Sequence, residues 1–434
     1  MSAAAPVASS SDTIYALSSG APPAAIAIVR ISGPQAAAAL TALTGRVPRP
    51  RHATRARVRH PVRGDMLDHA LALFFDAPAT ATGEDIAELH LHGGRAVVTS
   101  VEDALAGLPG LRRADAGEFT RRAFNNGRLD LAEAEGLADL LAAETEAQRR
   151  SALAMAEGAL SRHVEGWRLR LLDLAAEVEA AIDFSDEGEV GEDVPEAWRE
   201  RALRLAADMA ALLAQPPVER LKDGVRIVIA GPPNSGKSSL INYLADRDVA
   251  IISPVAGTTR DVLEAPVTIQ GLPLLLIDTA GLRDTEDAVE SIGVDRARAH
   301  ADSADLLLWL GAAKDCTRSD ALRISPKLDL GQSDPDADIA ISSFTGAGMD
   351  ELRSAIAERC RELLPRPDLP NINRRQRDCL SAAHEMIVAA IEERDLLIKA
   401  DAVRLCRFRF DEITGRAGID DMLDALFGRF CIGK

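Results

Sequence analysis

Short apolar runs separated by turn residues dominate the first part of the chain. Three of these runs predict strands, at residues 24–33, 70–75 and 86–91. Two segments with apolar residues at helical spacing predict short helices, at 36–43 and 97–108. The last predicted strand ends in His92-Gly93-Gly94. We therefore expect an N-terminal α+β domain over residues 1–118.

After residue 118 the pattern changes to apolar residues three and four positions apart, with almost no proline or strand signal as far as about residue 213. An acidic interruption at 186–193, followed by Pro195, predicts a loop between helices. The pair Pro216-Pro217 ends this segment, and the helical pattern resumes after three prolines near residue 367. The sequence predicts a helical domain in two pieces, 119–215 and 365–434.

Between the two helical pieces lie two apolar runs, 227–230 and 274–277, and each is followed by a loop that contains glycine. Helix on both sides of one α/β domain indicates an insertion, in which the two helical pieces pack together. The expected fold class is thus α/β and α. It comprises an N-terminal α+β domain, a helical domain, and an inserted phosphate-loop domain over residues 216–364 with a mostly parallel sheet.

Length and composition are consistent with several globular domains. The 434 residues are enough for two to four domains, and 47% of them are hydrophobic. The formal net charge is −17, so any contact with nucleic acid must use a local basic patch or the surface of a partner.

The five cysteines show no C-x-x-C pair and no spacing typical of a zinc site, which predicts a reducing compartment and no structural zinc. No apolar run approaches the ~18 residues of a membrane span, and no positively charged segment precedes the first apolar residues. We expect a cytoplasmic protein with no membrane contact.

One basic segment departs from the acidic average. Residues 46–63 carry seven arginines, and Arg55, Arg57 and Arg59 alternate as they would on one face of a strand. That face could meet phosphate groups. A solvated strand face is the favoured interpretation.

The strongest chemical signal follows the apolar run at 227–230. Gly231, four further residues and then Gly236-Lys237-Ser238 complete a phosphate loop. Glycines let backbone N–H groups surround phosphate oxygens at the positive end of the next helix. Lys237 would neutralise the terminal phosphates and Ser238 would hold Mg²⁺. The sequence predicts a site for a nucleoside triphosphate.

Two further motifs indicate a nucleotide switch. The run at 274–277 ends in Asp278-Thr279-Ala280-Gly281, whose aspartate would reach the Mg²⁺ shell and whose glycine N–H would meet the γ-phosphate. Between this motif and the phosphate loop, Thr258-Thr259 could supply a hydroxyl to Mg²⁺ from a first switch loop. Each motif alone matches an ordinary polar turn, but the order and spacing of all three predict a GTPase domain.

Two positions differ from common GTPase patterns. Leu282 stands where many GTPases have a glutamine that orients the attacking water, so another polar group must do so, and Glu290 is the candidate. The segment that best matches a guanine-reading motif is Pro326-Lys327-Leu328-Asp329, with proline in place of asparagine. Asp329 can still accept from the N–H groups of guanine. A last base-contacting loop is expected at Ser342-Ser343-Phe344.

At this level of detail the chain resembles the MnmE (TrmE) family of bacterial tRNA-modification GTPases over essentially its whole length. The segments that carry the resemblance are residues 30–33, 83–85, 92–94, 117–124, 127–130, 256–261 and the terminus 430–434 (FCIGK). The terminus is distinctive, because a phosphate-loop protein has no general reason to end in this way. The expected domain order agrees with that of the family.

The resemblance implies a homodimer whose N-terminal domains pair and bind a formyl-tetrahydrofolate. By similarity, the folate pocket is lined by Arg30, Glu88, Arg128 and Lys434. Arginine and lysine suit the carboxylates of the folate tail, and a glutamate suits the N–H groups of the pterin. Cys431, near this pocket by similarity, either takes part in the chemistry or is a buried structural thiol.

The resemblance also implies a GTPase domain that dimerises across its switch loops when K⁺ binds and stimulates hydrolysis. By similarity Glu290 and Lys237 are catalytic, Ser238 and Thr259 hold Mg²⁺, and Asn234, Ser253, Val255 and Thr258 surround K⁺. The remaining residues expected at GTP are Ser235, Gly236, Ser239, Pro254, Ala256, Gly257, Asp278, Thr279, Ala280, Gly281, Lys327, Asp329, Ser342, Ser343 and Phe344. Ser253-Pro254 stands where the family commonly has Thr-Asp.

For function, the resemblance implies GTP hydrolysis coupled to modification at C5 of the wobble uridine of certain tRNAs, together with the FAD-dependent partner MnmG. Two alternatives remain open on the residues alone. A ribosome-assembly or signalling GTPase would bind neither folate nor MnmG. A plain ATPase is disfavoured by Asp329 and by the Thr258-Thr259 switch.

Overall fold

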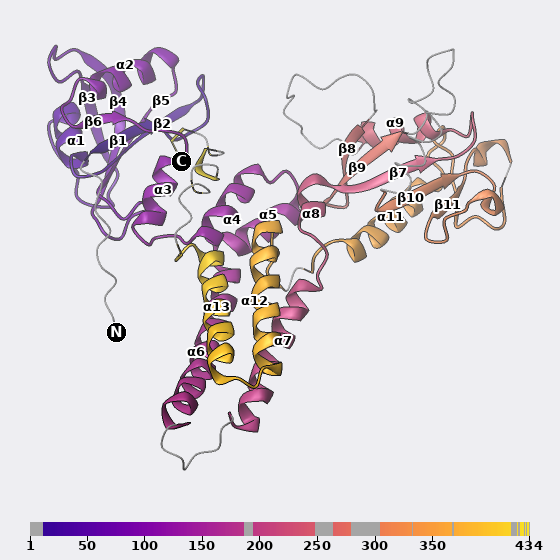
Figure 1. Cartoon of the computed structure of the whole chain (residues 1–434). Coiled ribbons are helices and arrows are strands. Elements are labelled where there is room, and N and C mark those ends of the chain that lie inside the picture. The colour runs from indigo at the N-terminus through magenta and orange to yellow at the C-terminus, as the bar shows by residue number, and fades with distance from the viewer. Residues whose placement is uncertain are drawn as a thin grey trace, which may run out of the picture. The chain divides into compact units, whose positions relative to one another are not determined.

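The computed structural model describes residues 12–185, 194–247, 264–278, 304–331, 333–366, 369–417, 423, 426–428, 430 and 432–433 (Figure 1). They belong to two compact units. The first comprises Met1–Ala138 and Thr414–Lys434, and the second comprises Asp139–Ile413. None of the helices in these described ranges is long and apolar enough to cross a membrane.

The first unit contains a six-stranded sheet in the order β3-β4-β5-β2-β1-β6. Its strands are β1 Thr13–Leu17, β2 Ile26–Ser32, β3 Thr54–Arg59, β4 Met66–Phe75, β5 Ile86–His92 and β6 Leu111–Arg113. Neighbours are antiparallel except β1 and β6. The three strands predicted from apolar runs are confirmed as β2, β4 and β5, whereas β1 and β6 were not predicted.

One face of this sheet is covered by α1 (Ala36–Thr44) and α2 (Arg95–Ala106), at the positions predicted for helices. Alternating side chains make this core: Ala56 and Val58 of β3 are buried with Val29 and Ile31 of β2 against both helices. On the opposite face, Phe119 of α3 (Glu118–Asn125) packs on β1. The sheet is thus apolar toward α1 and α2 and polar on its other face toward the β3 edge.

Helix α4 (Leu131–Ala142) begins beside the end of the chain. Its Leu131 and Ala134 share a buried cluster with Phe427 and Phe430. The rings of Phe124 and Phe427 lie 6.2 Å apart. The C-terminal segment is therefore part of the first unit.

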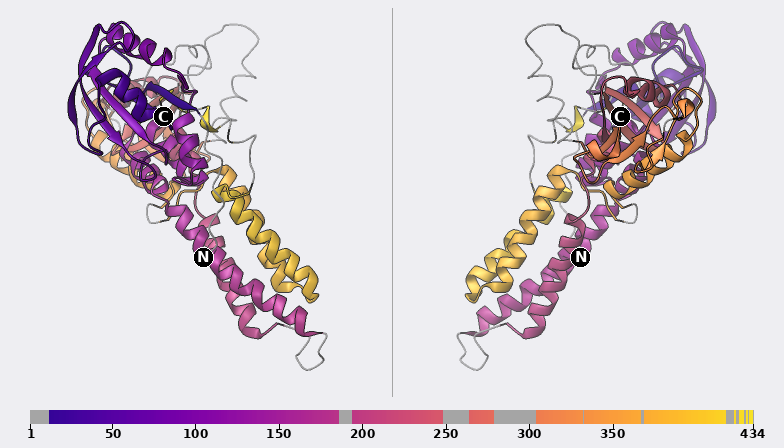
Figure 2. Two further views of the ribbon diagram at one scale, coloured as in Figure 1. Left: turned by 90° about the vertical axis from the view of Figure 1, so that its left-hand side faces the viewer. Right: turned by 90° about the vertical axis from the view of Figure 1, so that its right-hand side faces the viewer.

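The helical part of the second unit contains α5 to α7 from one piece of the chain and α12 and α13 from the other. Their bounds are α5 Glu146–Ala156, α6 Ala159–Ser185, α7 Glu196–Leu213, α12 Arg374–Glu392 and α13 Leu396–Thr414. The two pieces lie side by side (Figure 2). Trp167 of α6 stacks near Phe410 of α13, with ring centroids 6.0 Å apart, and Arg199 of α7 donates to the carbonyl of Ile391 in α12 at 2.8 Å. The predicted packing of the two helical pieces is confirmed.

The second unit also contains a six-stranded sheet in the order β12-β11-β10-β7-β9-β8. Its strands are β7 Val225–Ala230, β8 Glu264–Ile269, β9 Leu272–Asp278, β10 Leu306–Leu310, β11 Leu322–Ser325 and β12 Ile339–Ala340. All neighbours are parallel except β8 and β9, which confirms a mostly parallel sheet. Helices α9 (Lys237–Arg247) and α11 (Met349–Leu363) contribute to its core with α8 (Glu219–Asp223).

Candidate functional site

The phosphate loop joins the central strand β7 to α9, as the sequence predicts. Gly231, Asn234 and Gly236 have φ angles of 153°, 60° and 98°. A Cβ atom on Gly231 would lie 2.1 Å from the carbonyl oxygen of Leu310 in β10. Only glycine fits there, because the loop must leave β7 in tight contact with the neighbouring strand.

Two polar side chains of this loop are buried beside its backbone. Lys237, 8% exposed, donates from Nζ to the carbonyls of Gly231 at 3.1 Å and Pro232 at 3.0 Å. The hydroxyl of Ser235, 7% exposed, has no hydrogen-bond partner among the described residues. An unpaired buried hydroxyl costs about 1–3 kcal/mol. A phosphate oxygen would satisfy it, so the loop fits a phosphorylated ligand.

The parallel strands bring the other predicted nucleotide residues to the same edge of the sheet. In the register of β7 with β9, Ile229 lies opposite Asp278, so this aspartate ends its strand next to the phosphate loop. Ser238 and Ser239 are exposed in the first turn of α9. Mg²⁺ prefers oxygen ligands such as hydroxyls, so Ser238 fits a magnesium site beside the end of β9.

The two segments predicted to read the base follow β11 and β12 and are hydrogen-bonded together. Ser342, fully buried, donates from its hydroxyl to Oδ1 of Asp329 at 2.6 Å. The N–H of Leu328 donates to the carbonyl of Ile341 at 2.9 Å. Lys327 precedes this turn with a φ of 61°. The structure thus brings Lys327, Asp329 and Ser342 together. Ser343 is only partly exposed, whereas Phe344 is 92% exposed.

Two of the predicted folate residues, Arg30 of β2 and Glu88 of β5, are direct cross-strand neighbours. The Nε of Arg30 donates to Oε1 of Glu88 at 3.0 Å, and Nη2 of Arg30 lies 2.9 Å from the same oxygen. His90 approaches the other oxygen of Glu88 at 3.3 Å, and the Arg30 guanidinium lies 5.9 Å from the ring centre of Phe119. Sequence reasoning assigned no role to His90 or Phe119.

The positions of the other two predicted folate residues, Arg128 and Lys434, are judged from the hydrogen bonds of residues near them. Arg128 donates from Nε to the carbonyl of Thr80 at 3.1 Å, and Thr82 in the same loop is hydrogen-bonded to Ser32, two residues from Arg30. Lys434 lies outside the described residues, but Gly433 before it accepts from the Ser18 hydroxyl at 2.7 Å. The pairing of β1 with β2 ends at Leu17, next to Ser18. Gly433 therefore lies beside Ser18, next to the end of β1.

A buried charge network that sequence reasoning missed supports this region. Arg122, 5% exposed, lies 3.2 Å from Glu84, 2.9 Å from Asp12 and 3.1 Å from Glu118. Glu84 also accepts from the hydroxyl of Ser32 at 2.8 Å. Ser32, Glu84, Glu118 and Arg122 come from segments that carry the family resemblance, whereas Asp12 lies outside them, so no sequence signal pointed to it.

Glu118 shows how this network changes ionisation. Burial alone raises the pKa of its carboxyl. The side chains of Arg112 and Arg122 and the backbone N–H of Asp115 donate hydrogen bonds to it, and the positive charge of Arg112 adds to their effect. Together these interactions outweigh burial, so the pKa is lowered from 4.5. Glu118 is therefore an anion at neutral pH.

The described cysteines include two that are buried, and burial raises the pKa of Cys360 and of Cys406 to about 12. Both are neutral thiols at physiological pH and are poor nucleophiles. Cys431 lies outside the described residues, so both interpretations of its role stay open.

Several predicted nucleotide residues also lie outside the described residues. They are Ser253, Pro254, Val255, Ala256, Gly257, Thr258, Thr259, Thr279, Ala280, Gly281 and Glu290. Their roles remain predictions.

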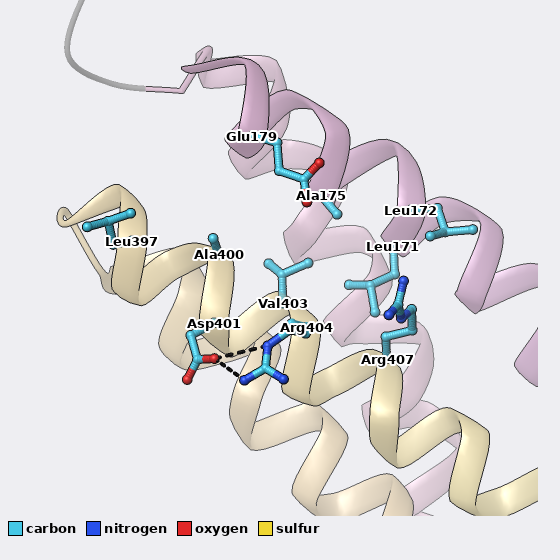
Figure 3. Close-up of a pocket in the computed structure, with 10 residues that line it drawn as sticks. All are labelled: Leu171, Leu172, Ala175, Glu179, Leu397, Ala400, Asp401, Val403, Arg404 and Arg407. Carbon is cyan, nitrogen blue, oxygen red and sulfur yellow. Dashed lines mark hydrogen bonds and ion pairs between the residues drawn. The ribbon is translucent and has the colours of Figure 1, made fainter. Parts of the chain in front are cut away.

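The helical part of the second unit has a separate groove of about 320 Å³ between α6 and α13 (Figure 3). Val403 and Leu171 lie in its wall, and Arg404 is paired with Asp401 at its rim at 2.5 Å. The groove contains none of the residues predicted for nucleotide or folate.

Comparison with known proteins agrees with these features. A family model described as "GTP-binding protein TrmE N-terminus" matches residues 13–128, and one described as "MnmE helical domain" matches residues 131–431. The chain is 54% identical over 433 residues to the "tRNA modification GTPase MnmE" of Rhizorhabdus wittichii, covering 99% of this chain and 98% of the relative. It is 46% identical over 435 residues to the protein of the same name from Zymomonas mobilis, covering 97% and 100%. The chain therefore belongs to the MnmE family of tRNA modification GTPases.

Proposed function

We propose that this chain hydrolyses GTP to GDP and phosphate as part of an assembly that modifies C5 of the wobble uridine of certain tRNAs. The observation that carries the proposal is the phosphate loop, with its buried Lys237 and its unpaired Ser235 hydroxyl, on the same sheet edge as Asp278 and Asp329. The name of the full-length relatives supports the tRNA part.

In this proposal each nucleotide residue has a defined task. Lys237 neutralises charge on the terminal phosphates, and Asp329 accepts from the N–H groups of guanine. Ser238 and Thr259 hold Mg²⁺, which when bound supplies positive charge to the phosphates. Asn234, Ser253, Val255 and Thr258 surround K⁺, which stimulates hydrolysis. Glu290 orients the attacking water, because Leu282 has no polar atom to do so.

The N-terminal domain is proposed to bind a formyl-tetrahydrofolate, which supplies the one-carbon unit. Arg30, Arg128 and Lys434 would bind the carboxylates of its tail, and Glu88 would accept from N–H groups of its pterin. The ion pair between Arg30 and Glu88 supports this assignment, because the two partly buried side chains already orient each other on this face of the sheet. Two copies of the chain would pair through these domains, and the assembly would include the flavoprotein MnmG in the cytoplasm.

The first experiment compares GTP hydrolysis by the purified chain in K⁺ and in Na⁺ at equal ionic strength. We expect strong stimulation by K⁺ and loss of hydrolysis in Glu290→Ala with GTP binding retained. Equal rates in both salts would count against the cation site and favour a GTPase that acts as a binding switch. Efficient competition by ATP would favour a plain ATPase.

The second experiment tests the coupling of hydrolysis to modification. Wild-type chain and Glu290→Ala are each mixed with GTP, Mg²⁺, K⁺, MnmG, formyl-tetrahydrofolate and unmodified tRNA, and modified uridine is measured. Full modification by the variant would contradict the coupling. It would leave the GTPase assignment intact.

A further inference from the structure

The basic segment singled out in the sequence forms an edge of the N-terminal sheet. Residues 46–63 contain seven arginines and two histidines but no aspartate or glutamate, in a chain of net charge −17. Six of its 18 residues form β3, whose one strand partner in the described part of the chain is β4, so β3 is an edge strand. A cluster of positive charges at the edge of a sheet creates a local positive potential.

Three of the arginines share one face of this edge. Ala56 and Val58 point into the core, so Arg55, Arg57 and Arg59 between them point to the opposite face, where all three are exposed. Alternate residues of a strand lie about 6.6 Å apart. The three guanidinium groups thus form a row with a spacing comparable to that of successive phosphates along a nucleic-acid strand.

Most of these charges are not used by the protein itself. The guanidinium groups of Arg46, Arg49, Arg55 and Arg57 are exposed and make no hydrogen bond, ion pair or ring contact with the described residues. By contrast, Arg63 pairs with Asp65 at 3.2 Å, and Arg59 donates to the carbonyl of Gly64 at 3.0 Å. A charge row kept only for solubility would not need to exclude every acidic neighbour from an 18-residue segment.

The arginine row lies on the same sheet face as two candidate folate residues, Arg30 and Glu88. Arg55 is opposite Leu71, Leu71 is opposite His90, and Glu88 lies two residues from His90 on β5. Strand spacing puts β3 about 14 Å from β2, which carries Arg30. A ligand bound along β3 would therefore lie within reach of the Arg30–Glu88 pair.

We propose that this row binds the phosphate backbone of the tRNA substrate and so positions it on the face that carries the folate residues. The guanidinium fork donates to phosphate oxygens in a bidentate geometry. The segment between Arg46 and Arg63 has no Phe, Tyr or Trp, and its arginines outnumber its two histidines, so we infer a contact made mainly to the phosphate backbone and independent of sequence. The inference rests on the proposed tRNA substrate and adds the surface that holds it.

A second copy of the chain and an anionic membrane fit the face that carries the arginine row less well than tRNA does. In a symmetric contact between two copies through β3, the same arginines would meet one another, and like charges repel. An anionic membrane would be expected to meet an amphipathic helix, but the basic segment is a strand and a turn with Val62 as its main exposed apolar side chain.

The test is tRNA binding by the full-length chain over a range of salt concentrations, with an unmodified tRNA transcript as the probe. The variant combines Arg49→Gln, Arg55→Gln and Arg57→Gln. The control removes the same charge from exposed arginines of the second unit, with Arg150→Gln, Arg204→Gln and Arg394→Gln. Each phosphate contact contributes roughly 0.7–0.9 to the slope of log K against log salt concentration. We expect the variant to reduce that slope by about 2 and the control to leave it unchanged.

Three outcomes would overturn the inference. The first is an unchanged slope in the arginine variant. The second is a change in oligomeric state, measured by light scattering, with tRNA binding intact, which would make the face a contact between copies. The third is binding of phosphatidylglycerol vesicles through these arginines with no effect on tRNA.

The same measurements separate this inference from the proposed function. GTP hydrolysis and folate binding by the arginine variant should equal those of the wild type. If wild-type chain itself shows no salt-dependent binding of tRNA, then the proposed substrate fails along with its surface. If the wild-type chain binds tRNA in a salt-dependent way and the arginine variant has the same salt dependence, the inference is wrong and the proposed substrate stands.

Discussion

The hydroxyl of Ser342 donates a hydrogen bond of 2.6 Å to Oδ1 of Asp329, and it joins the loops that follow β12 and β11. The two residues are thirteen positions apart, and the serine is fully buried while the carboxylate is near the surface. A buried donor fixes the orientation of the carboxylate before any ligand arrives, which lowers the entropic cost of binding. Asp329 is therefore oriented in advance to accept from a base.

Replacing Asp329 with asparagine should change which base is bound. Guanine presents N–H groups where the carboxylate accepts, whereas xanthine presents a carbonyl that an amide can meet. Since a hydrogen bond to a charged group contributes about 1.5–3 kcal/mol, GDP affinity should fall by roughly ten- to a hundredfold while XDP affinity rises. Titration calorimetry with both nucleotides measures this. The control is Asp336→Asn on an exposed residue of the same region, and unchanged GDP affinity in Asp329→Asn would contradict the assignment.

Alanine at Gly231 should destabilise the nucleotide domain. The added Cβ would lie 2.1 Å from the Leu310 carbonyl, at a φ of 153° that other residues rarely adopt. Overpacking and backbone strain together predict a loss of about 2–5 kcal/mol in the free energy of unfolding. Chemical denaturation followed by tryptophan fluorescence measures the loss. Gly166→Ala is the matched control, because its Cβ meets nothing within 4 Å inside α6, and it should leave stability unchanged or raise it slightly.

Removing the Arg122 guanidinium should destabilise the N-terminal domain. Three carboxylates, those of Asp12, Glu84 and Glu118, lie within 3.2 Å of this buried group. An unpaired buried charge costs about 3–5 kcal/mol, so Arg122→Ala should lose that amount and Arg122→Lys somewhat less. Hydrogen exchange of peptides covering residues 12–32 and 111–125 reports the local loss. Protection equal to that of the exposed control Arg95→Ala would show that the network is not stabilising.

Acid should weaken the same region through Glu118. Its pKa is lowered in the folded chain from an ordinary 4.5, so its ionised form stabilises the fold above pH 4.5 and this contribution is lost as pH falls through the folded pKa. Glu118→Gln should be less stable than wild type at neutral pH, and the difference should shrink toward pH 3. A constant difference across that range, measured by the same hydrogen exchange, would assign the effect to packing instead of charge.

The parts of this fold that sequence predicts well are those specified by contiguous residues. The phosphate loop, β7 and α9 form one uninterrupted segment, so spacing alone identifies them. Strands β1 and β6 were not predicted because they are short, five and three residues, and depend on pairing with distant partners. Arg122 contacts Asp12 across 110 positions of sequence, and no local pattern records such a contact.

The folate assignment depends on Arg30 and Glu88 acting as a pair, and a double-mutant cycle tests this. Arg30→Ala removes the cation and leaves the largely buried carboxylate of Glu88 with His90 as its one remaining side-chain partner among the described residues, whereas Glu88→Gln keeps the shape and removes the charge. Each single variant should weaken binding of 5-formyl-tetrahydrofolate at least tenfold, and the double variant should lose less than the sum in free energy, because the two residues orient each other. Calorimetry measures all four affinities. Strict additivity would mean that the ligand contacts the two side chains independently, and no loss in either variant would place the folate elsewhere.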